Sequence, residues 1–396
     1  MDRRTFIRVV GGGTVGAAGA LFLPGCSSDY PAAAVAPWSG PLDSGDVRRW
    51  ALGHAILAPN SHNRQPWLVD LREPDAITLY VDRERMLPQT DPWFRQIVVS
   101  QGTFVELLVI ALRQRGIEPR VELFPEGDFA PRQVDARPVA RIHWAAGAGR
   151  ASPDPLYAQI LRRCTAKVDY DTSRPVAPGV LRALAGAMPP EAGFGVRLGG
   201  TVDAARLEPL RTLCWEAARA ELTTSRTVME SLRLTRVGPA EIAAHPDGLP
   251  LNEPIVRLID AVGLFDRRQP PEEGSAAYKN MMARFEGYSR TAMGFVWLGT
   301  ATAANAAARR TRSAELAAGR AYVRLQLQAT ALGLQMHPMS QAPQEFEEMR
   351  PHYERLHALT VQQPADVETV QMFCRIGYCA DQQHTPRRGV DAIIRA

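Results

Sequence analysis

The stretch that decides the fold reads PNSHNRQPW and runs from Pro59 to Trp67. It packs small amide and hydroxyl side chains into a turn directly before a predicted strand, 67–71. Such a turn presents backbone N–H groups, carbonyls and side-chain amides to one ligand face, which suits the polar edge of a flavin ring. An Asx-type turn closed by prolines explains the same residues without a ligand, and the residues alone leave both interpretations open.

Outward from this turn, the first part of the chain combines short extended segments with helices. A long apolar run, 97–115, is stopped by Gly116 and predicts a helix with a buried face. The other expected elements are a helix over 47–57 and strands over 67–71, 77–82, 121–124 and 139–144. These elements make up an N-terminal half, 46–150.

The second part of the chain repeats this architecture with little residue identity. Gly333 ends a late helix as Gly116 ends the first long one. Helices are expected over 156–163, 204–233 and 315–332, and strands over 195–198 and 370–378. We therefore expect an α+β fold of two related halves in one chain, 46–150 and 151–396. The stretch 235–275, rich in Pro, Gly and charge, predicts a surface insertion that can act as a lid over a pocket.

The N-terminal 26 residues are typical of a twin-arginine export signal. Arg3 and Arg4 open it, and the apolar stretch 9–22 that follows is short for a membrane span. The leader ends in LPGC at Cys26, which resembles a bacterial lipobox; a soluble exported form is the alternative to an acylated Cys26. Residues 27–45 predict a flexible tether. We expect export by the twin-arginine machinery, to the periplasm or as a membrane-anchored lipoprotein.

The composition is that of an ordinary globular protein, 45% hydrophobic and 22% charged over 396 residues, a length that favours two cores. The net charge of +4 comes from arginines that are scattered along the chain, so nucleic-acid binding is not expected. His and Cys do not cluster with metal-ligand spacing, so no metal site is expected either. For the four cysteines after Cys26, buried thiols are the simpler expectation than disulfides.

Two basic motifs lie in the second half. The segment Arg163-Cys164-Thr165-Ala166-Lys167 places basic side chains beside a hydroxyl where a helix gives way to an extended segment, so they can converge on one phosphate. The other, Thr385-Pro386-Arg387-Arg388, lies near the C-terminus. Taken singly, each motif is better explained as solvated surface charge.

Four motifs, taken together and in this order, resemble those of FMN-dependent nitroreductases. PNSHNRQPW resembles Pro-Ser-Ser-x-Asn-x-Gln-Pro-Trp, and 163–167 resembles the Arg-Arg-Ser-x-Arg motif that holds the FMN phosphate and ring edge. Pro338-Met339-Ser340-Gln341 stands where a backbone N–H approaches the flavin N5, and 385–388 resembles the closing phosphate motif. The best match is the Acg-like branch, single chains that fold as a fused pseudo-dimer of the nitroreductase-like fold.

The resemblance implies a site for FMN between the motifs. One side would be lined by Pro59, Asn60, Ser61, Asn63 and Gln65, and the other by Arg163, Thr165, Lys167, Pro338, Met339, Ser340, Gln341, Arg387 and Arg388. Asn60, Arg64, Cys164 and Gln341 depart from the family pattern. These departures bear on the ring edge and the substrate face more than on the phosphate.

Each motif occurs in one half only, so one FMN site can be assembled across the halves and its symmetry mate cannot. A monomer is therefore expected to form the site. The implied function is an oxidoreductase that passes electrons or hydride to a nitro, quinone or other conjugated small molecule, with its catalytic residues unidentified. An exported FMN-binding protein with little turnover, which sequesters the cofactor, is the alternative. Because NAD(P)H is not expected outside the cytoplasm, we expect a quinone or a redox protein as electron donor.

Overall fold

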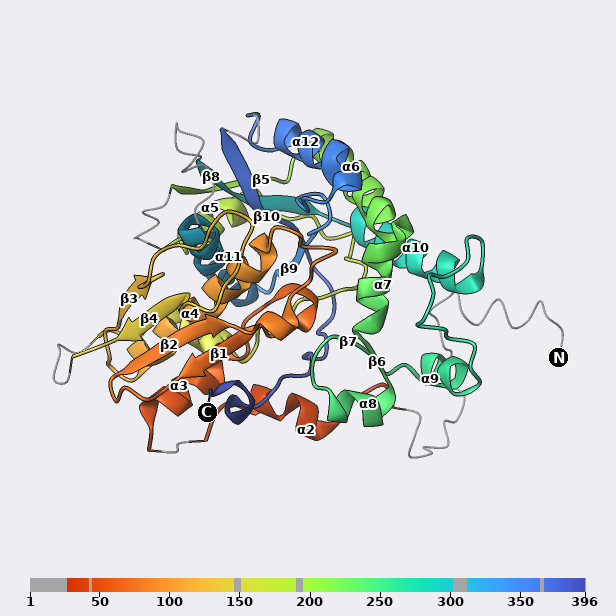
Figure 1. The fold of residues 1–396 in the computed structure, drawn as a ribbon. Helices are drawn as coiled ribbons and strands as arrows, with labels where there is room; N and C mark the ends of the chain where they lie inside the picture. The colour runs from red at the N-terminus through yellow and green to blue at the C-terminus, as the bar shows by residue number, and fades with distance from the viewer. Residues whose placement is uncertain are drawn as a thin grey trace.

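The computed structural model describes residues 27–42, 45–145, 151–189, 195–301, 312–363 and 367–395, and each half carries a four-stranded sheet (Figure 1). The expected leader, 1–26, lies outside the described residues. In the first half the strands are β1 (Trp67–Asp70), β2 (Ala76–Val81), β3 (Arg120–Leu123) and β4 (Ala140–His143). They lie in the order β1-β2-β4-β3, and all neighbours are antiparallel.

The sheet of the second half has the same topology. Its strands are β5 (Val196–Thr201), β8 (Gly294–Ala301), β9 (Gln335–Pro338) and β10 (Glu368–Gly377). They lie in the order β5-β8-β10-β9, again antiparallel throughout. In both halves two strands precede a long helix and two follow it, and the third strand lies at the sheet edge. The prediction of an α+β fold built from two related halves is therefore confirmed.

The halves meet along their long helices, α4 (Arg95–Gln114) and α11 (Arg312–Ala331). A Cβ added to Gly102 would stand 2.0 Å from the carbonyl oxygen of Leu316, and a Cβ added to Gly319 would stand 2.0 Å from that of Val99. Only glycine permits this approach on either helix. The contact is reciprocal, because each glycine meets the carbonyl three residues before the other glycine. Such a reciprocal contact is the mark of a pseudo-two-fold axis between two copies of one fold.

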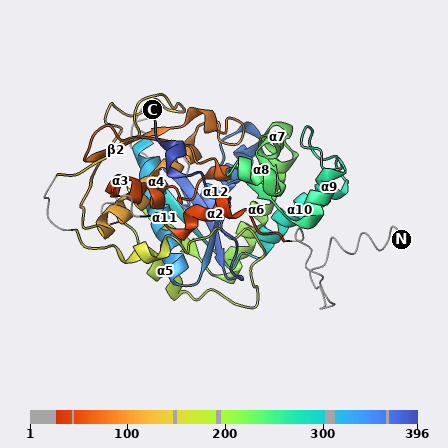
Figure 2. The same ribbon diagram turned by 90° about the horizontal axis from the view of Figure 1, so that it is seen from below.

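A helical insertion separates β5 from β8, where only a short turn joins β1 to β2. It comprises α6 (Ala204–Thr223), α7 (Ser225–Arg233), β6 (Thr235–Val237), α8 (Gly238–Ala244), β7 (Leu249–Leu251), α9 (Pro254–Ala261) and α10 (Ala276–Arg290). The strands β6 and β7 form a small parallel pair. These elements, green to teal, gather on one side of the molecule (Figures 1 and 2). The insertion is longer than the expected 235–275, because three helices outside that range also lie between the two strands.

Short helices complete the fold: α2 (Ala32–Val35), α3 (Val47–Ala55), α5 (Gly179–Ala185) and α12 (Arg350–Leu359), with 3-10 turns at 36–39, 61–63, 83–85, 155–159, 347–349 and 390–393. The side chain of Asp46 caps α3 by accepting from the Arg48 N–H, and α3 packs against α4 in the core of the first half. The C-terminal tail returns to that half, where Ile394 forms a parallel bridge with Val69 of β1. The tail thereby crosses from the second half to the first.

The N-terminal residues 27–40, which we call the strap, are packed onto the body. The expectation of a flexible tether over 27–45 is wrong for 32–39, which forms α2 and a 3-10 turn. Trp38 is buried, and its indole Nε1 donates to the Thr385 carbonyl at 2.8 Å. The Arg387 N–H donates to the Ala34 carbonyl at 2.9 Å. One buried tryptophan thus anchors a segment whose alanine and proline content predicts looseness.

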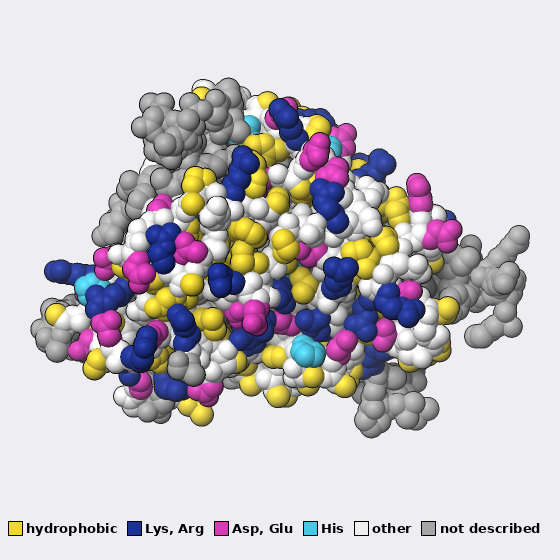
Figure 3. All heavy atoms as spheres, viewed as in Figure 1, with side chains coloured by type: hydrophobic (Ala, Val, Ile, Leu, Met, Phe, Trp, Pro, Cys, Tyr) yellow, Lys and Arg dark blue, Asp and Glu magenta, His cyan; other side chains and the backbone are white. Residues whose placement is uncertain are grey.

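Among the described residues one helix, α4, is long and apolar enough to cross a membrane, and its residues from Arg95 to Leu112 are buried inside the protein. A core helix between two packed halves passes the same test. On the face shown in Figure 3, basic and acidic side chains are interspersed, without a broad patch of either sign.

Candidate functional site

Two arginines from different motifs converge in the interior, and we call them the arginine pair. Arg163 follows the 3-10 turn at 155–159, and Arg387 lies in the C-terminal tail. Both are almost fully buried, and both donate to the Leu57 carbonyl, at 2.9 and 3.5 Å. Burial lowers the pKa of each guanidinium, and the charge of Arg163 lowers that of Arg387 further. Within the described residues neither side chain has a carboxylate partner.

Neutral side chains hold the pair in place. Gln326 of α11 accepts from Arg163 Nη1 at 3.2 Å and donates to Thr165 Oγ1 at 2.9 Å. Asn63 accepts from Arg387 Nη1 at 2.6 Å. The Nε atoms of both arginines are buried without a hydrogen-bond partner among the described residues. Two buried cations with neutral neighbours and unsatisfied donors are the arrangement that a bound anion would stabilise.

The strap covers this pair. The guanidinium carbons of Arg163 and Arg387 each lie 5.1 Å from the centroid of the Trp38 ring. That ring also stacks on His384, with centroids 4.2 Å apart and planes 12° from parallel. An indole face attracts cations, so Trp38 offsets part of the cost of burying two like charges and excludes water from them.

The first motif forms a strained turn in which the backbone of His62, Asn63 and Gln65 adopts φ of 48°, 52° and 50°. Residues other than glycine rarely adopt the left-handed backbone conformation, and clusters of residues that do so occur at functional sites. One hydrogen bond within the turn fixes its shape: Asn60 Oδ1 accepts from the Gln65 N–H at 2.7 Å. A second joins the turn to the C-terminal tail, where Asn63 Nδ2 donates to the Pro386 carbonyl at 3.0 Å.

From the sequence we expected the side-chain amides of Asn60, Asn63 and Gln65 to face a ligand. In the structure they are hydrogen-bonded to protein groups. Gln65 donates to the Pro246 carbonyl at 2.8 Å and accepts from the Arg388 N–H at 2.7 Å. Because the three side chains bind protein groups, their role in the structure is to shape the turn and to join it to the insertion and the tail.

The remaining expected residues of the turn are anchored on α4. The Pro59 carbonyl accepts from Thr103 Oγ1 at 2.7 Å. Ser61 Oγ donates to Gln96 Oε1 at 3.0 Å, and the Ser61 N–H donates to Ser100 Oγ at 3.3 Å. The turn thus lies against the helix through which the two halves meet.

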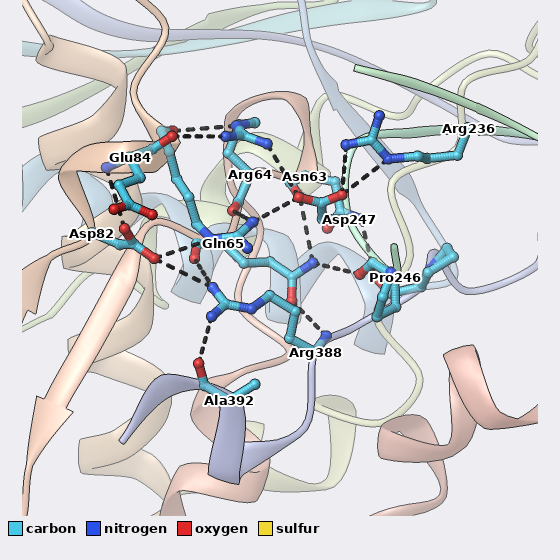
Figure 4. A network of polar contacts seen from close by, with 12 residues as sticks. Asn63, Arg64, Gln65, Asp82, Glu84, Arg236, Pro246, Asp247, Arg388 and Ala392 are labelled. Carbon is cyan, nitrogen blue, oxygen red and sulfur yellow. Dashed lines mark hydrogen bonds and ion pairs between the residues drawn. The ribbon is translucent and has the colours of Figure 1, made fainter. Parts of the chain in front are cut away.

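A second cluster of arginines lies beside the first motif, around Asp247 of the insertion (Figure 4). Arg64 Nη1, Arg85 Nη1 and Arg236 Nη2 lie 3.1, 2.6 and 2.9 Å from the Asp247 carboxylate oxygens. Burial alone would raise the pKa of Asp247, but Arg236 and Arg85 hold it below its usual value. We call these four residues the Asp247 network. It fastens the insertion to the first motif, together with the Gly248 N–H, which donates to the Asn63 carbonyl at 3.1 Å.

Arg388 belongs with this second cluster, and the expectation that it joins a phosphate clamp is not supported. Its Nη1 lies 3.6 Å from Asp82 Oδ2, and the side chain also donates to the carbonyls of Gln65 and Ala392 (Figure 4). Its charge is therefore balanced by a carboxylate, although it stands next to Arg387 in the sequence.

Lys167 and His62 lie near one another, because the charge of Lys167 lowers the pKa of His62; we call their surroundings the recess. Lys167 is accessible to solvent, yet burial and the nearby Arg284 lower its pKa, which indicates a position in a hollow rather than on the open surface. Burial, Lys167 and Arg64 lower the pKa of His62 to about 3, so this imidazole is neutral. Its Nε2 lies 3.1 Å from Ser231 Oγ of α7.

The segment Pro338-Met339-Ser340-Gln341 ends β9 and reaches the same recess. Met339 is buried, and its N–H donates to the Phe373 carbonyl at 2.8 Å, whereas Ser340 and Gln341 are half-buried. Gln341 hydrogen-bonds Glu221 of α6, a buried carboxyl whose pKa is raised by burial and lowered in turn by its bonds and by Lys167. Gln341 and Lys167 therefore both lie near Glu221.

Several residues of the site carried no recognisable signal in the sequence. Arg375 of β10 donates to the carbonyls on either side of Lys167, those of Ala166 at 3.4 Å and Val168 at 2.6 Å, and so fixes its backbone. Gln326 and Asp247 were likewise unmarked. Only Trp38, a lone aromatic in an alanine-rich stretch, offered a cue.

A separate solvent-open hollow of about 670 Å³ lies between Gln89 and α7, away from the motifs. Its Arg226 and Glu348 pair with each other at 2.5 Å, and Arg233, which also lines it, is exposed. Among the described residues no group of His, Cys, Asp and Glu could hold a metal ion. The four described cysteines are unpaired.

Comparison with solved structures finds proteins of nitroreductase type at low similarity. An FMN-dependent nitroreductase from Mycobacterium smegmatis in complex with NADPH is 18% identical, with a TM-score of 0.35, over 60% of this chain and 96% of that one. A nitroreductase-like family protein from Bacillus cereus is 11% identical, with a TM-score of 0.33, over 63% and 98%.

Sequence comparison is more specific but shorter. No family model matches the chain. A Mycobacterium tuberculosis protein provisionally named NAD(P)H nitroreductase acg is 32% identical over 80 residues, 20% of this chain and 24% of that protein. A second protein of that organism with a nitroreductase name is 33% identical over 78 residues, 22% of its length. The match thus spans about a quarter of these curated relatives. Over that stretch the chain is similar to mycobacterial proteins with nitroreductase names, and the resemblance that its motifs indicated is confirmed.

Proposed function

We propose that this chain binds FMN, with its phosphate on the arginine pair, and acts as a nitroreductase-like oxidoreductase. The observation that carries the proposal is the pair itself: Arg163 and Arg387 are buried beside each other, and neither has a carboxylate partner among the described residues. Both Nε donors are unsatisfied. A phosphate dianion would supply the missing charge and accept from these donors. The donor set therefore fits the cofactor that the motifs imply.

The recess would receive the ring. Lys167 is four residues from Arg163, so one extended segment would reach from the phosphate to the ring edge. Neutral His62 and half-buried Gln341 would line the remaining wall. Bound FMN would supply hydride and electron transfer, and the chain would hold it, exclude water and place the acceptor. The relatives carry nitroreductase names and solved neighbours are described with FMN, which supports this assignment.

For the acceptor we propose a small conjugated molecule, a nitro compound or a quinone. For the donor we propose a quinone or a redox protein, because the leader predicts a location without NAD(P)H. The mycobacterial relatives are named for NAD(P)H, so a nicotinamide donor is the competing assignment. We further propose one FMN per chain without dimerisation, since each motif occurs once.

A second function, FMN sequestration with little turnover, is favoured by the covering of the site. The strap lies on the arginine pair through Trp38, and the insertion is fastened to the first motif through Asp247 and Pro246. With the strap on one side and the insertion on another, the exchange of bound FMN with solvent would be slow and an acceptor would have restricted access to it.

An absorbance spectrum after gentle purification tests the cofactor, and acid-released flavin measured against protein tests the stoichiometry. A colourless protein that does not take up added FMN would remove the proposal. Anaerobic reduction followed by menadione or a nitroaromatic then separates the two functions. We expect acceptor-dependent reoxidation; retention of reduced FMN with both acceptors would favour sequestration.

Export is a separate proposal. Arg3→Lys with Arg4→Lys should leave the protein in the cytoplasm with its flavin, because the twin-arginine route requires that pair and folding does not. Fractionation with flavin fluorescence measures this. Unchanged export of the double variant would assign the chain to another route, and labelling with a fatty-acid analogue in wild type and Cys26→Ala would decide acylation.

A further inference from the structure

The helix α9 exposes an apolar face at the edge of the insertion. Ile255, Leu258 and Val262 are 37%, 58% and 59% exposed, and Leu264 just beyond the helix is 75% exposed. The spacing of the first three places them on one side of a helix. No residue of α9 is buried, although the helix is strongly amphipathic in sequence. Four of the seven large exposed apolar side chains of the described residues thus lie within ten positions.

The start of the described chain lies beside this helix. Asn252, two residues before α9, donates from its side chain to the Asp29 carbonyl of the strap. Cys26 precedes Asp29 by three residues, which span at most about 11 Å even when fully extended. An acyl group on Cys26, or the apolar leader itself, would therefore enter a bilayer within reach of α9.

Residues around Lys167 lie close to the start of α9. Arg284 of α10, which lowers the pKa of Lys167, lies 3.9 Å from Glu253 at the start of α9. Tyr30 of the strap has neighbours on both sides of this opening, because Glu253, Cys164 and Arg284 all affect its pKa, which burial raises to about 12. The strap, the first turn of α9 and α10 thus meet around Lys167.

We propose that α9 docks on a lipid surface, with Ile255, Leu258, Val262 and Leu264 in the interfacial layer. The occupant is a bilayer rather than a second copy of the chain, because Asn252 holds Asp29 next to this face, and the expected leader and an acylated Cys26, three residues before Asp29, would bring a membrane to it. Basic and acidic residues are mixed around α9, so the contact is apolar and depends little on anionic lipid. Docking there would bring the residues around Lys167 close to the bilayer, the source of lipid-soluble quinones.

Brominated-lipid quenching tests this contact directly. Leu258→Trp and, as matched control, Leu332→Trp are placed singly in the full chain; both leucines are exposed, and Leu332 follows α11. Each variant is mixed with phosphatidylethanolamine and phosphatidylglycerol vesicles with and without brominated acyl chains. We expect additional quenching at position 258 and none at 332. Equal quenching at both positions would overturn the proposal, because the leader alone would then explain binding.

A charged face gives the complementary result. In a Cys26→Ala background, Leu258→Glu with Val262→Glu should lower the vesicle-bound fraction by roughly tenfold, whereas Leu332→Glu should not change it. Unchanged binding contradicts lipid docking. Light scattering without vesicles supplies the other outcome: a dimer that Leu258→Glu separates would assign this face to a second copy. Flavin content is measured in the same samples and should be unchanged, so failure here leaves the FMN assignment untouched.

Discussion

Two groups of arginines flank the first motif, and they differ in how their charge is balanced. In the Asp247 network, three guanidiniums surround one carboxylate at 2.6 to 3.1 Å. In the arginine pair, Arg163 and Arg387 are more deeply buried, and among the described residues their neighbours are amides, hydroxyls, carbonyls and an indole. Both groups contact the turn at 60–65. Each arginine of the Asp247 network has a carboxylate within 3.1 Å, whereas the arginine pair has none among the described residues. We therefore expect an anion from outside the chain to bind at the pair.

The contrast separates structural arginines from binding arginines more reliably than the sequence does. Arg387 and Arg388 are neighbours in one motif, yet they lie in different groups. A carboxylate within reach assigns Arg388 to the structure, and the lack of one assigns Arg387 to a ligand. Removing a charge should therefore lower the stability of the fold in the Asp247 network, but the affinity for the ligand in the arginine pair.

The largest expected effect is in the Asp247 network. Asp247→Asn leaves Arg64, Arg85 and Arg236 without their common carboxylate, and breaking such a buried arrangement costs about 3 kcal/mol or more in the free energy of unfolding. Urea denaturation measures it. As a control, Asp266→Asn removes the partner of Arg268, which is 90% exposed, and should change the stability by less than about 0.5 kcal/mol. Equal stabilities of the two variants would mean that the network does not fasten the insertion.

The arginine pair should instead respond in ligand affinity. Arg163→Met or Arg387→Met removes a charge-assisted contact worth about 1.5 to 3 kcal/mol, so FMN binding should weaken by roughly one to two decades. Arg388→Met is the matched control and should bind FMN within about threefold of wild type, since its charge is balanced within the chain. Flavin release followed by fluorescence measures all three. Normal retention by both pair variants, or an equal loss in Arg388→Met, would erase the distinction between the groups.

The sequence was sufficient for the halves but not for the partners of the motif residues. Periodicity and glycine stops located α4, α11, the four strands of the first sheet and β5 and β10 of the second, because the signals for those elements are local, whereas β8 and β9 were not predicted. The first motif was placed correctly in a turn, but its amides were assigned to a ligand. Their actual partners, Pro246 and Pro386, come from segments some 180 and 320 residues away, and no local pattern encodes such contacts.

The same limit explains the strap. Alanine, serine and proline in 27–45 predict a loose chain, and the docking of Trp38 depends on Thr385 and His384 at the other end of the sequence. Resemblance to a family supplied Arg163 and Arg387, but not which of the two adjacent arginines faces the ligand. Charge balance in three dimensions decides that, because it counts the carboxylates that folding brings within reach.

Inorganic phosphate should distinguish the groups on a smaller scale. Phosphate at ten times its dissociation constant stabilises a protein that binds it only when folded by about 1.4 kcal/mol. Thermal unfolding of flavin-free protein should therefore shift upward with phosphate in wild type and in Arg388→Met, and not in Arg163→Met. Chloride at matched ionic strength is the control. A phosphate shift that persists in Arg163→Met would place the anion elsewhere.

The smallest expected effect concerns His62, which lies between the groups with Lys167 on one side and Arg64 on the other. Its pKa is about 3 in the folded protein, below the 6.5 of an unfolded chain, so below about pH 7 the folded state binds fewer protons than the unfolded state. Above about pH 7 the titration of His62 does not affect the free energy of unfolding. As the pH falls through 6.5, the free energy of unfolding declines because only the unfolded state takes up the proton. Linkage gives a loss of about 0.8 kcal/mol between pH 8 and pH 6.

In His62→Gln that contribution should vanish, so the wild type should lose about 0.8 kcal/mol more than the variant over the same interval. The baseline is taken at pH 8, where any difference between the two proteins reflects the lost bond to Ser231 rather than titration. Urea denaturation at pH 8, 7 and 6 without flavin provides the measurement. If the free energies of unfolding of wild type and His62→Gln changed equally from pH 8 to pH 6, folded His62 would be able to accept a proton near Lys167 and Arg64. The recess would then tolerate added positive charge, contrary to the electrostatics that separate the two arginine groups.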